Sequence, residues 1–227
     1  MSVHTESLRS RNQALLVIVM VNLKGGSGKT TSAAWILHAL HESGLSVLGV
    51  DADPENESLI GWSQLAEWDV PVIAMPVANL HRQLPGVIAP SIDVVVIDTP
   101  PMKDSRRIVK SAAKLATHIV CPMAPTGIEY DRLAAVRELV TEVSDDAEIP
   151  PEFVVLFNRV VTNAASTGAY RDIISKDGVR VLNPTITRRE LFAQSYPQPI
   201  ERAATSAYGD AVNDLLTPPA DATEATA

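Results

Sequence analysis

The sequence contains little cysteine, few aromatic residues and no long apolar run. Cys121 is the single cysteine among 227 residues, which excludes a disulfide framework and makes a reducing cytoplasm the expected location. No apolar stretch reaches the roughly 20 residues that span a bilayer, and residues 1–12 lack the apolar core of a signal peptide. The formal net charge of −8 argues against a protein that coats nucleic acid through its overall charge. Binding to DNA would therefore need a local basic patch.

Short apolar runs alternate with helical patterns along most of the chain. The hydrophobic content of 46% is enough for a full core, and no internal repeat or linker divides it. Residues 1–12 and 217–227 are polar or poor in bulky apolar side chains, so we expect both to be flexible tails. The remaining residues, 13–216, are expected to form a single domain.

Seven apolar runs are predicted to be strands, and five segments with helical spacing are predicted to be helices. The first run, Leu15–Val21, is apolar at every position, as a strand buried on both faces of a parallel sheet requires. The other expected strands are 45–51, 70–75, 93–98, 117–123, 152–158 and 179–182, and the expected helices are 30–43, 105–116, 129–143, 170–176 and 203–216. This alternation implies a three-layer α/β fold, in which helices cover both faces of a mostly parallel, twisted sheet. Ligands of such sheets bind beyond the carboxyl ends of the strands.

Residues 22–31, with the sequence NLKGGSGKTT, follow the first predicted strand and lead into the first helix. Three of them are glycines, Gly25, Gly26 and Gly28. Glycines let the backbone turn tightly and direct successive N–H groups at an anion, and the dipole of the following helix favours the same charge. Lys29 is placed to reach the terminal phosphates of a nucleotide, and the Thr30 hydroxyl is placed to bind Mg²⁺. A glycine-rich turn with two solvated lysines is the alternative, but it explains neither the spacing nor the position between strand and helix.

This segment departs from the general phosphate-loop pattern, because Leu23 replaces the first glycine and Lys24 adds a second lysine. In both respects it resembles the deviant Walker A motif of the ParA/MinD family of ATPases. The resemblance implies a P-loop NTPase fold that binds ATP and Mg²⁺, with contacts to the nucleotide from Gly25, Gly26, Ser27, Gly28, Lys29, Thr30 and Thr31. It also implies a homodimer around two ATP molecules, in which Lys24 crosses the interface and touches the nucleotide of the other subunit. A cation supplied in this way acts like an arginine finger.

Carboxylates follow two further predicted strands. Asp98 ends the run DVVVID, and a carboxylate in this position is the Walker B arrangement, which would hold Mg²⁺ together with Thr30. Asp51 and Asp53 lie in the segment VDADPENES, which resembles the family's DxDPQ motif, with Glu55 in place of the usual glutamine. The resemblance implies that Asp53 orients the attacking water. It also implies that Asp51 assists nearby through Mg²⁺-bound water. An aspartate that starts a turn before proline is the alternative for Asp53.

Two later segments match the family less specifically. The segment 99–101, with the sequence TPP, resembles the switch segment that senses the γ-phosphate. Asn158 would, by the same resemblance, read the adenine base and favour ATP over GTP, whereas the alternative is an asparagine that caps a strand. The chain beyond Pro184 is expected to pass beside the base.

Two sets of basic residues are candidates for binding DNA. The first set shares one face of a predicted helix and consists of Arg106, Lys110 and Lys114. The simpler interpretation of this set is a solvated protein surface. The second set lies where partition ATPases of the family carry arginines that bind DNA without sequence preference once the dimer forms: Arg188, Arg189 and Arg202. Phosphate contacts of this kind would give weak, salt-sensitive binding.

Missing features discriminate among the members of the family. Residues 217–227 do not resemble the basic amphipathic membrane helix of MinD-like proteins, and one cysteine cannot bind the cluster of nitrogenase-reductase-like proteins. The sequence therefore predicts a cytoplasmic, nucleoid-associated ATPase like the small ParA-type partition proteins, with no membrane contact. A ParB-like partner would stimulate its slow hydrolysis. Two alternatives stay open: the positioning of a protein cargo, and a metabolic ATP-dependent synthetase on the same scaffold.

Overall fold

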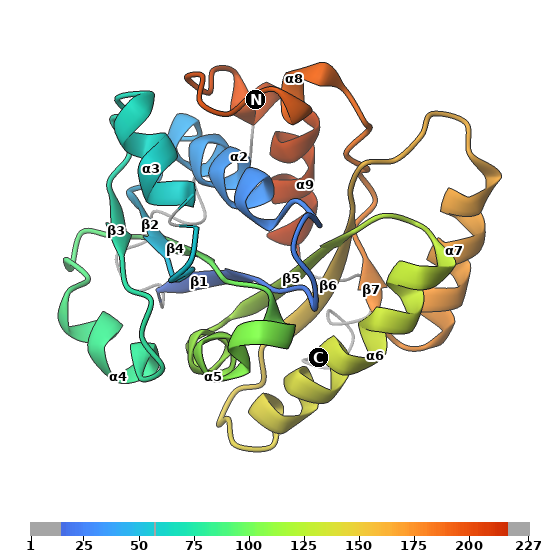
Figure 1. Ribbon diagram of the computed structural model, residues 1–227, viewed down its shortest axis with the longest axis horizontal. Coiled ribbons are helices and arrows are strands. Elements are labelled where there is room, and N and C mark those ends of the chain that lie inside the picture. The colour runs from blue at the N-terminus through green and yellow to red at the C-terminus, as the bar shows by residue number, and fades with distance from the viewer. Residues whose placement is uncertain (1–14, 57, 218–227) are drawn as a thin grey trace, which may run out of the picture.

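The computed structural model describes residues 15–56 and 58–217. Within them, seven strands form one sheet with the order β3-β2-β4-β1-β5-β6-β7, and every neighbouring pair is parallel. Helices cover both faces of this sheet (Figure 1). The predicted three-layer α/β fold of P-loop NTPases is therefore confirmed. The predicted tails, residues 1–12 and 217–227, lie outside the described residues except for Thr217, so their flexibility stays a prediction.

All seven predicted strands are present, although most are shorter than the apolar runs that predicted them. Their bounds are β1 (Leu16–Met20), β2 (Val47–Asp51), β3 (Val72–Ala74), β4 (Val94–Asp98), β5 (His118–Met123), β6 (Glu152–Phe157) and β7 (Arg180–Val181). The two strands β2 and β4 are buried at every position, and β1 is buried at all but its first residue. Because helices cover both faces, these central strands have no solvent-facing side, which explains their continuous apolar sequence.

The helices include three that were not predicted. Their bounds are α2 (Lys29–Glu42), α3 (Ser58–Leu65), α4 (Leu80–Gln83), α5 (Met102–Ala113), α6 (Gly127–Ser144), α7 (Ala165–Lys176), α8 (Glu190–Ala193) and α9 (Ala207–Leu215), with two 3-10 turns, η1 (Leu84–Gly86) and η2 (Ala203–Thr205). The unpredicted α4 and α8 have four residues each, too few for a helical period to show, and α3 contains Gly61, which disfavours a helix. No helix of the described segments is both long enough and apolar enough to cross a membrane.

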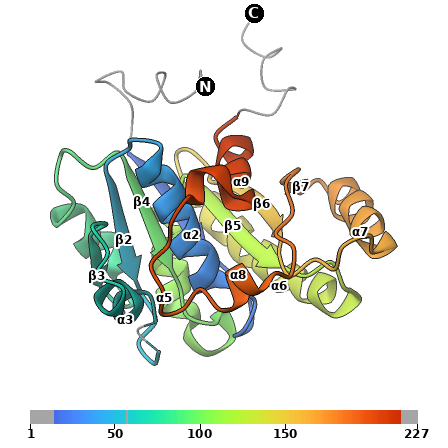
Figure 2. The same cartoon turned by 90° about the horizontal axis from the view of Figure 1, so that it is seen from above.

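Aromatic side chains attach the C-terminal part of the chain to α2, the helix that follows the glycine-rich loop. Figure 2 shows α2 between α3 and α9. Trp35 of α2 stacks on Tyr208 of α9 with ring centroids 5.9 Å apart, and Phe192 of α8 meets Trp35 edge-on at 4.9 Å. The Tyr208 hydroxyl also lies 3.2 Å from the Ser32 hydroxyl. This cluster positions α8 and α9 relative to the start of α2.

The basic face of α5 packs against acidic residues that follow or belong to α6. Lys110 Nζ lies 2.9 Å from Glu142 Oε2, and Arg106 donates a hydrogen bond to the same carboxylate. Lys114 Nζ lies 3.4 Å from Asp146 Oδ2. Because Arg106 and Lys110 share one carboxylate, these partly exposed ion pairs offset two of the three positive charges of this set.

His38 of α2 is a buried histidine with a depressed pKa. Its ring meets Trp68 edge-on with centroids 4.5 Å apart, and its Nε2 atom has no hydrogen-bond partner within the part of the chain that the structure describes. Desolvation lowers the pKa of His38 to about 4, although Glu42 acts in the opposite direction. The folded protein therefore keeps this ring neutral at a pH where an exposed histidine would bind a proton.

We expect His38 to contribute a decrease in the free energy of unfolding as the pH is lowered from 6.5 to about 4, the ordinary and the depressed pKa of its ring. Asp98, whose pKa is raised to about 7, acts in the opposite direction, so the His38 contribution is the difference between the wild type and His38→Leu. In this window the unfolded chain binds a proton at His38 and the folded chain does not, so stability decreases by up to about 3 kcal/mol. Urea unfolding across this pH range measures the effect. His38→Leu should remove this part of the pH dependence, whereas His41→Leu, at an exposed position of the same helix, should retain it. A pH dependence that His38→Leu leaves unchanged would contradict the assignment.

Candidate nucleotide-binding site

The predicted site residues meet at the carboxyl edge of the sheet. The phosphate loop, residues 22–31, leaves β1 and enters α2. Asp51 and Asp98 end β2 and β4, and the parallel register places them directly beside each other. Asn158 follows β6, and its side chain reaches back to the phosphate loop. The fold therefore brings together residues that are distant in sequence, at the edge where ligands of such sheets bind.

Two glycines hold the phosphate loop in conformations that other residues seldom adopt. The backbone φ angles are +72° at Gly26 and +90° at Gly28, both in the left-handed region. A Cβ atom at Gly28 would also stand 2.3 Å from Asn158 Nδ2, so this position requires glycine for a second reason. Gly28 caps α2 without a side-chain hydrogen bond. The first N–H groups of α2 can therefore serve an anion, which also benefits from the helix dipole.

The two lysines of the loop have opposite environments. Lys29 is 6% exposed, and its Nζ lies 3.1 Å from the Lys24 carbonyl oxygen. Burial lowers the pKa of Lys29, whereas the nearby Asp98 and Asp53 raise it. Lys24 is exposed, and its side chain makes no hydrogen bond or ion pair with the described residues. Lys29 is therefore built into the site, while Lys24 is accessible to another molecule.

Thr30 and Asp98 form the candidate Mg²⁺ site. The Thr30 hydroxyl donates to Asp98 Oδ2 at 2.6 Å, and Asp98 Oδ1 is buried with no hydrogen-bond partner among the residues described. Burial raises the pKa of Asp98 to about 7, against the effect of the Thr30 hydrogen bond. A buried carboxylate with an unsatisfied oxygen is stabilised by a cation, and oxygen ligands suit Mg²⁺. The two residues therefore fit the predicted ion.

Asp51 and Asp53 organise the chain between β2 and α3. Asp51 Oδ2 accepts hydrogen bonds from two backbone N–H groups of α3 at 2.8 and 3.0 Å, and its Oδ1 accepts from the Asp53 N–H at 3.0 Å. Burial raises the pKa of Asp51, while these hydrogen bonds lower it. The Asp53 carboxylate accepts from the Glu55 N–H and from the Asn56 side chain, both at 3.0 Å. Asp53 thus starts a turn, as the alternative interpretation expected, and the roles of both aspartates toward water stay predictions.

The Asn158 side chain braces the phosphate loop against β6. Its Nδ2 donates to the Ser27 carbonyl oxygen at 3.3 Å, and its Oδ1 accepts from the Arg159 N–H at 2.7 Å. Asn158 is only 5% exposed. Both ends of the amide therefore have partners within the chain, and its predicted contact with adenine stays a prediction.

The segment 99–101, which resembles the switch segment, joins β4 to α5, and the first residues of α5 are bonded to the phosphate loop. The Met102 N–H donates to the Asn22 carbonyl oxygen and the Lys103 N–H to the Leu23 carbonyl oxygen, both at 3.1 Å. The Thr99 hydroxyl donates to the Met20 carbonyl oxygen at 2.6 Å. The segment 99–101 is therefore held to β1 at Thr99, and the helix that it leads into is held to the phosphate loop.

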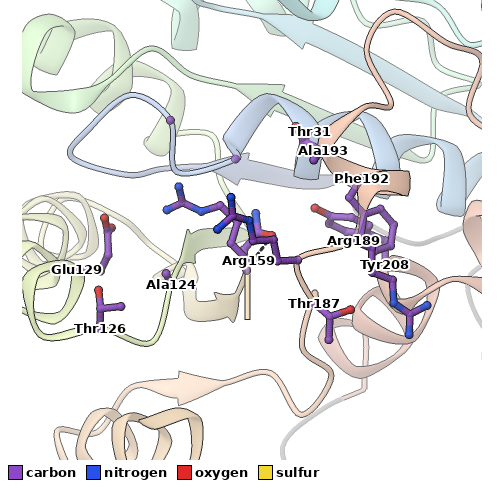
Figure 3. A pocket seen from close by; sticks show the side chains of 14 residues that line it. Thr31, Ala124, Thr126, Glu129, Arg159, Thr187, Arg189, Phe192, Ala193 and Tyr208 are labelled. Carbon is purple, nitrogen blue, oxygen red and sulfur yellow. Dashed lines mark hydrogen bonds between the residues drawn. The ribbon is translucent and has the colours of Figure 1, made fainter. Parts of the chain in front are cut away.

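A cavity of about 670 Å³ opens beside the phosphate loop (Figure 3). Its size is typical of small-molecule sites. Thr31, at the end of the loop, lines one side of the cavity. Phe192 and Tyr208 supply an aromatic wall. Arg159 and Glu129 also line it. None of these last four residues was predicted from the sequence, and only the position of Arg159, directly after Asn158, could have indicated one of them.

The structure separates the three arginines predicted to bind DNA. Arg188 and Arg189 are exposed and line the cavity beside the start of α2. Arg202 immediately precedes η2, which is held at the other end of α2 by a 2.8 Å hydrogen bond from the Ala204 N–H to Glu42. The 14 residues of α2, at about 1.5 Å per residue, separate its ends by roughly 20 Å. The three arginines therefore do not form one patch on a single subunit.

The chain matches one family model and is similar to two known proteins over most of its length. The family model described as the CobQ/CobB/MinD/ParA nucleotide binding domain matches residues 18–198. The chain is 27% identical over 212 residues to maintenance of carboxysome distribution protein A of Halothiobacillus neapolitanus, covering 88% of this chain and 94% of that protein. It is 25% identical over 182 residues to protein ParA of Rhizobium radiobacter, covering 78% of this chain and 80% of that protein.

A solved structure shares the fold. The crystal structure of a plasmid partition protein from Borrelia burgdorferi bound to AMPPNP superposes with a TM-score of 0.66. The alignment covers 89% of this chain and 99% of that chain, at 18% sequence identity. At this identity the similarity concerns the arrangement of the sheet and helices rather than a shared activity.

Proposed function

The chain belongs to the CobQ/CobB/MinD/ParA family of nucleotide-binding domains, and from this premise we propose that it is an ATPase that forms a homodimer around two ATP molecules. The main support is the position of the Thr30–Asp98 pair at the end of the phosphate loop. The 2.6 Å hydrogen bond leaves one buried oxygen of Asp98 unsatisfied, as an Mg²⁺ site requires. Residues of the loop would hold the phosphates against this ion.

Each side chain has a proposed role. Lys29 stabilises negative charge on the terminal phosphates, and Asp53 orients the attacking water. Thr30 and Asp98 hold Mg²⁺, which when bound neutralises charge on the phosphate oxygens. The part of the nucleotide beyond the phosphates enters the cavity next to Thr31, where Asn158 lies within reach of the base. Asp51, which lies beside Asp98, assists through water bound to Mg²⁺.

The proposed dimer binds DNA nonspecifically, and a ParB-like partner stimulates hydrolysis and release. The proposed contacts to DNA phosphates are made by Arg188, Arg189 and Arg202. Because these arginines lie at the two ends of α2, each subunit would touch the duplex at two separate places. The similarity to protein ParA of Rhizobium radiobacter supports a role in plasmid or chromosome partition, on the nucleoid in the cytoplasm.

Positioning of a protein cargo is the second candidate function. It is favoured by the similarity to maintenance of carboxysome distribution protein A, which extends over 94% of that protein. Both candidates require the same nucleotide-dependent dimer and differ in the adaptor. Precipitation of the ATP-bound protein from its own cells with its associated proteins separates them, because a ParB-like protein indicates partition and a component of a protein assembly indicates cargo positioning.

Lys24→Ala is expected to keep nucleotide binding and lose the ATP-dependent dimer. The Lys24 side chain has no partner among the described residues, so its removal leaves the folded monomer intact. In the dimer the same change removes the lysine that would contact each nucleotide from the other subunit. The dissociation constant of the dimer should therefore rise at least tenfold, or about 1.4 kcal/mol. Light scattering with ATP and Mg²⁺ measures the dimer, and fluorescence titration measures nucleotide binding.

The control for this experiment is Lys176→Ala, which removes an exposed lysine at the end of α7. It should dimerise as the wild type does. A Lys24→Ala protein with an unchanged ATP-dependent dimer would show that Lys24 does not act across the interface.

A further inference from the structure

Arg159 has an unusual backbone conformation beside the phosphate loop. Its φ angle is +56°, in the left-handed region that is unfavourable for residues other than glycine. Arg159 is exposed, directly follows Asn158 and lines the cavity. Strained residues that persist in a fold concentrate at ligand sites, where surrounding contacts hold them in place.

The surrounding contacts link the Arg159 backbone to the phosphate loop. Its N–H donates to Asn158 Oδ1 at 2.7 Å, and Asn158 Nδ2 donates to the Ser27 carbonyl oxygen at 3.3 Å. Two successive hydrogen bonds therefore connect the position of Arg159 to the loop that would bind phosphates. Gly26 and Gly28 of this loop line the same cavity as Arg159, so an anion held by the loop would lie at the cavity that Arg159 also lines.

The charge of Arg159 has no partner among the described residues. Its guanidinium forms no hydrogen bond or ion pair with any residue in 15–56 or 58–217, although Glu129 lines the same cavity. The Glu129 carboxylate is paired with Arg132 at 2.8 Å instead. Figure 3 shows Arg159 between the side of the cavity formed by Ala124, Thr126 and Glu129 and the side that carries Thr187 and Phe192.

We propose that Arg159 binds the phosphate chain of the nucleotide held in its own subunit. This inference rests on the proposed ATPase function. It gives the nucleotide a second cation from the same subunit, in addition to Lys29. Guanidinium groups form two parallel hydrogen bonds with phosphate oxygens, so one arginine can both fix and neutralise the ligand. The gain in binding would offset the cost of the left-handed backbone.

The test measures ADP binding with Mg²⁺ by calorimetry on the full chain, because ADP avoids turnover. Arg159→Gly should weaken ADP binding about tenfold. Its melting temperature should not fall, because glycine adopts a positive φ without strain. Glu67→Gly is the matched control, since Glu67 is also an exposed charged residue with a positive φ, 49°, but does not line the cavity. It should bind ADP as the wild type does.

Arg159→Lys tests whether charge carries the effect. At low salt it should bind ADP more tightly than Arg159→Gly, and raising the salt should weaken the wild type more than Arg159→Gly, because screening acts on the lost charge. An Arg159→Lys protein that is as weak as Arg159→Gly at low salt, or an Arg159→Gly protein that binds ADP with wild-type affinity, would overturn the inference alone. A wild-type protein that binds neither ADP nor ATP would overturn the proposed function together with it.

Discussion

Gly28→Ala is expected to lower ATP hydrolysis about 100-fold while leaving the fold intact. The new Cβ atom would stand 2.3 Å from Asn158 Nδ2, and the backbone at this position has a φ of +90°. Either the phosphate loop moves away from β6, or the Asn158 amide gives up its hydrogen bond to Ser27. The first outcome displaces Lys29, which is the next residue, and the second removes the brace that holds the loop in place. A displacement of about 1 Å at a reacting group can cost about 100-fold in rate. Phosphate release with saturating ATP and Mg²⁺ measures the loss.

Gly26→Ala is the matched control for this prediction. Gly26 also has a positive φ, +72°, but a Cβ there has nothing within 4 Å. It therefore pays the left-handed cost of roughly 1–2 kcal/mol without a collision. The difference between the two variants isolates the contact with Asn158. Equal rates for Gly28→Ala and Gly26→Ala would show that backbone strain alone limits the loop.

Gly209→Ala is expected to have the largest effect on stability, lowering the free energy of unfolding by about 3 kcal/mol. A Cβ at Gly209 of α9 would stand 2.1 Å from the Ala204 carbonyl oxygen and 2.9 Å from that of Ala203. Both atoms belong to the backbone of η2, so no side chain can rotate away. The first residues of α9 must then move, and Tyr208, which packs on Trp35, would move with them. Urea unfolding gives the change in stability.

Gly168→Ala provides the helical control. Gly168 lies in α7 at an exposed position, and a Cβ there has nothing within 4 Å. Alanine should stabilise the protein by about 0.5–1 kcal/mol, because glycine loses more backbone freedom on forming a helix. If Gly209→Ala proved as stable as Gly168→Ala, the close approach of α9 to η2 would be wrong.

The sequence predicted the centre of the site because that part depends on local geometry. The glycines of the phosphate loop, Lys29 and Thr30 lie within one segment between a strand and a helix, so their spacing determines how they are placed. The carboxylate of Asp98 ends a strand, and in a parallel sheet the strand ends share one edge. The seven strands were predicted for a related reason, since burial on both faces leaves continuous apolar runs.

Contacts between distant segments were not predictable in the same way. The brace from Asn158 to Ser27 joins residues that are 131 positions apart, and no local pattern indicates that this amide faces the loop instead of a base. Arg188 and Arg202 are both DNA-binding candidates by sequence, but the folded chain places them at opposite ends of α2. The basic residues Arg106, Lys110 and Lys114 pair with Glu142 and Asp146, which the sequence alone could not assign as partners.

By itself, the sequence determined the α/β architecture, the phosphate loop and the identity of the residues proposed to hold the phosphates and Mg²⁺, because periodicity and motif spacing act over one or two elements. The tertiary structure alone decided what lies beside that loop. It brought Arg159, Phe192 and Tyr208 to one cavity, and it turned the Asn158 amide toward the loop. The reason is physical: a side chain's neighbours across a fold depend on how the helices and strands pack, and a single sequence shows which faces are apolar without showing which faces meet.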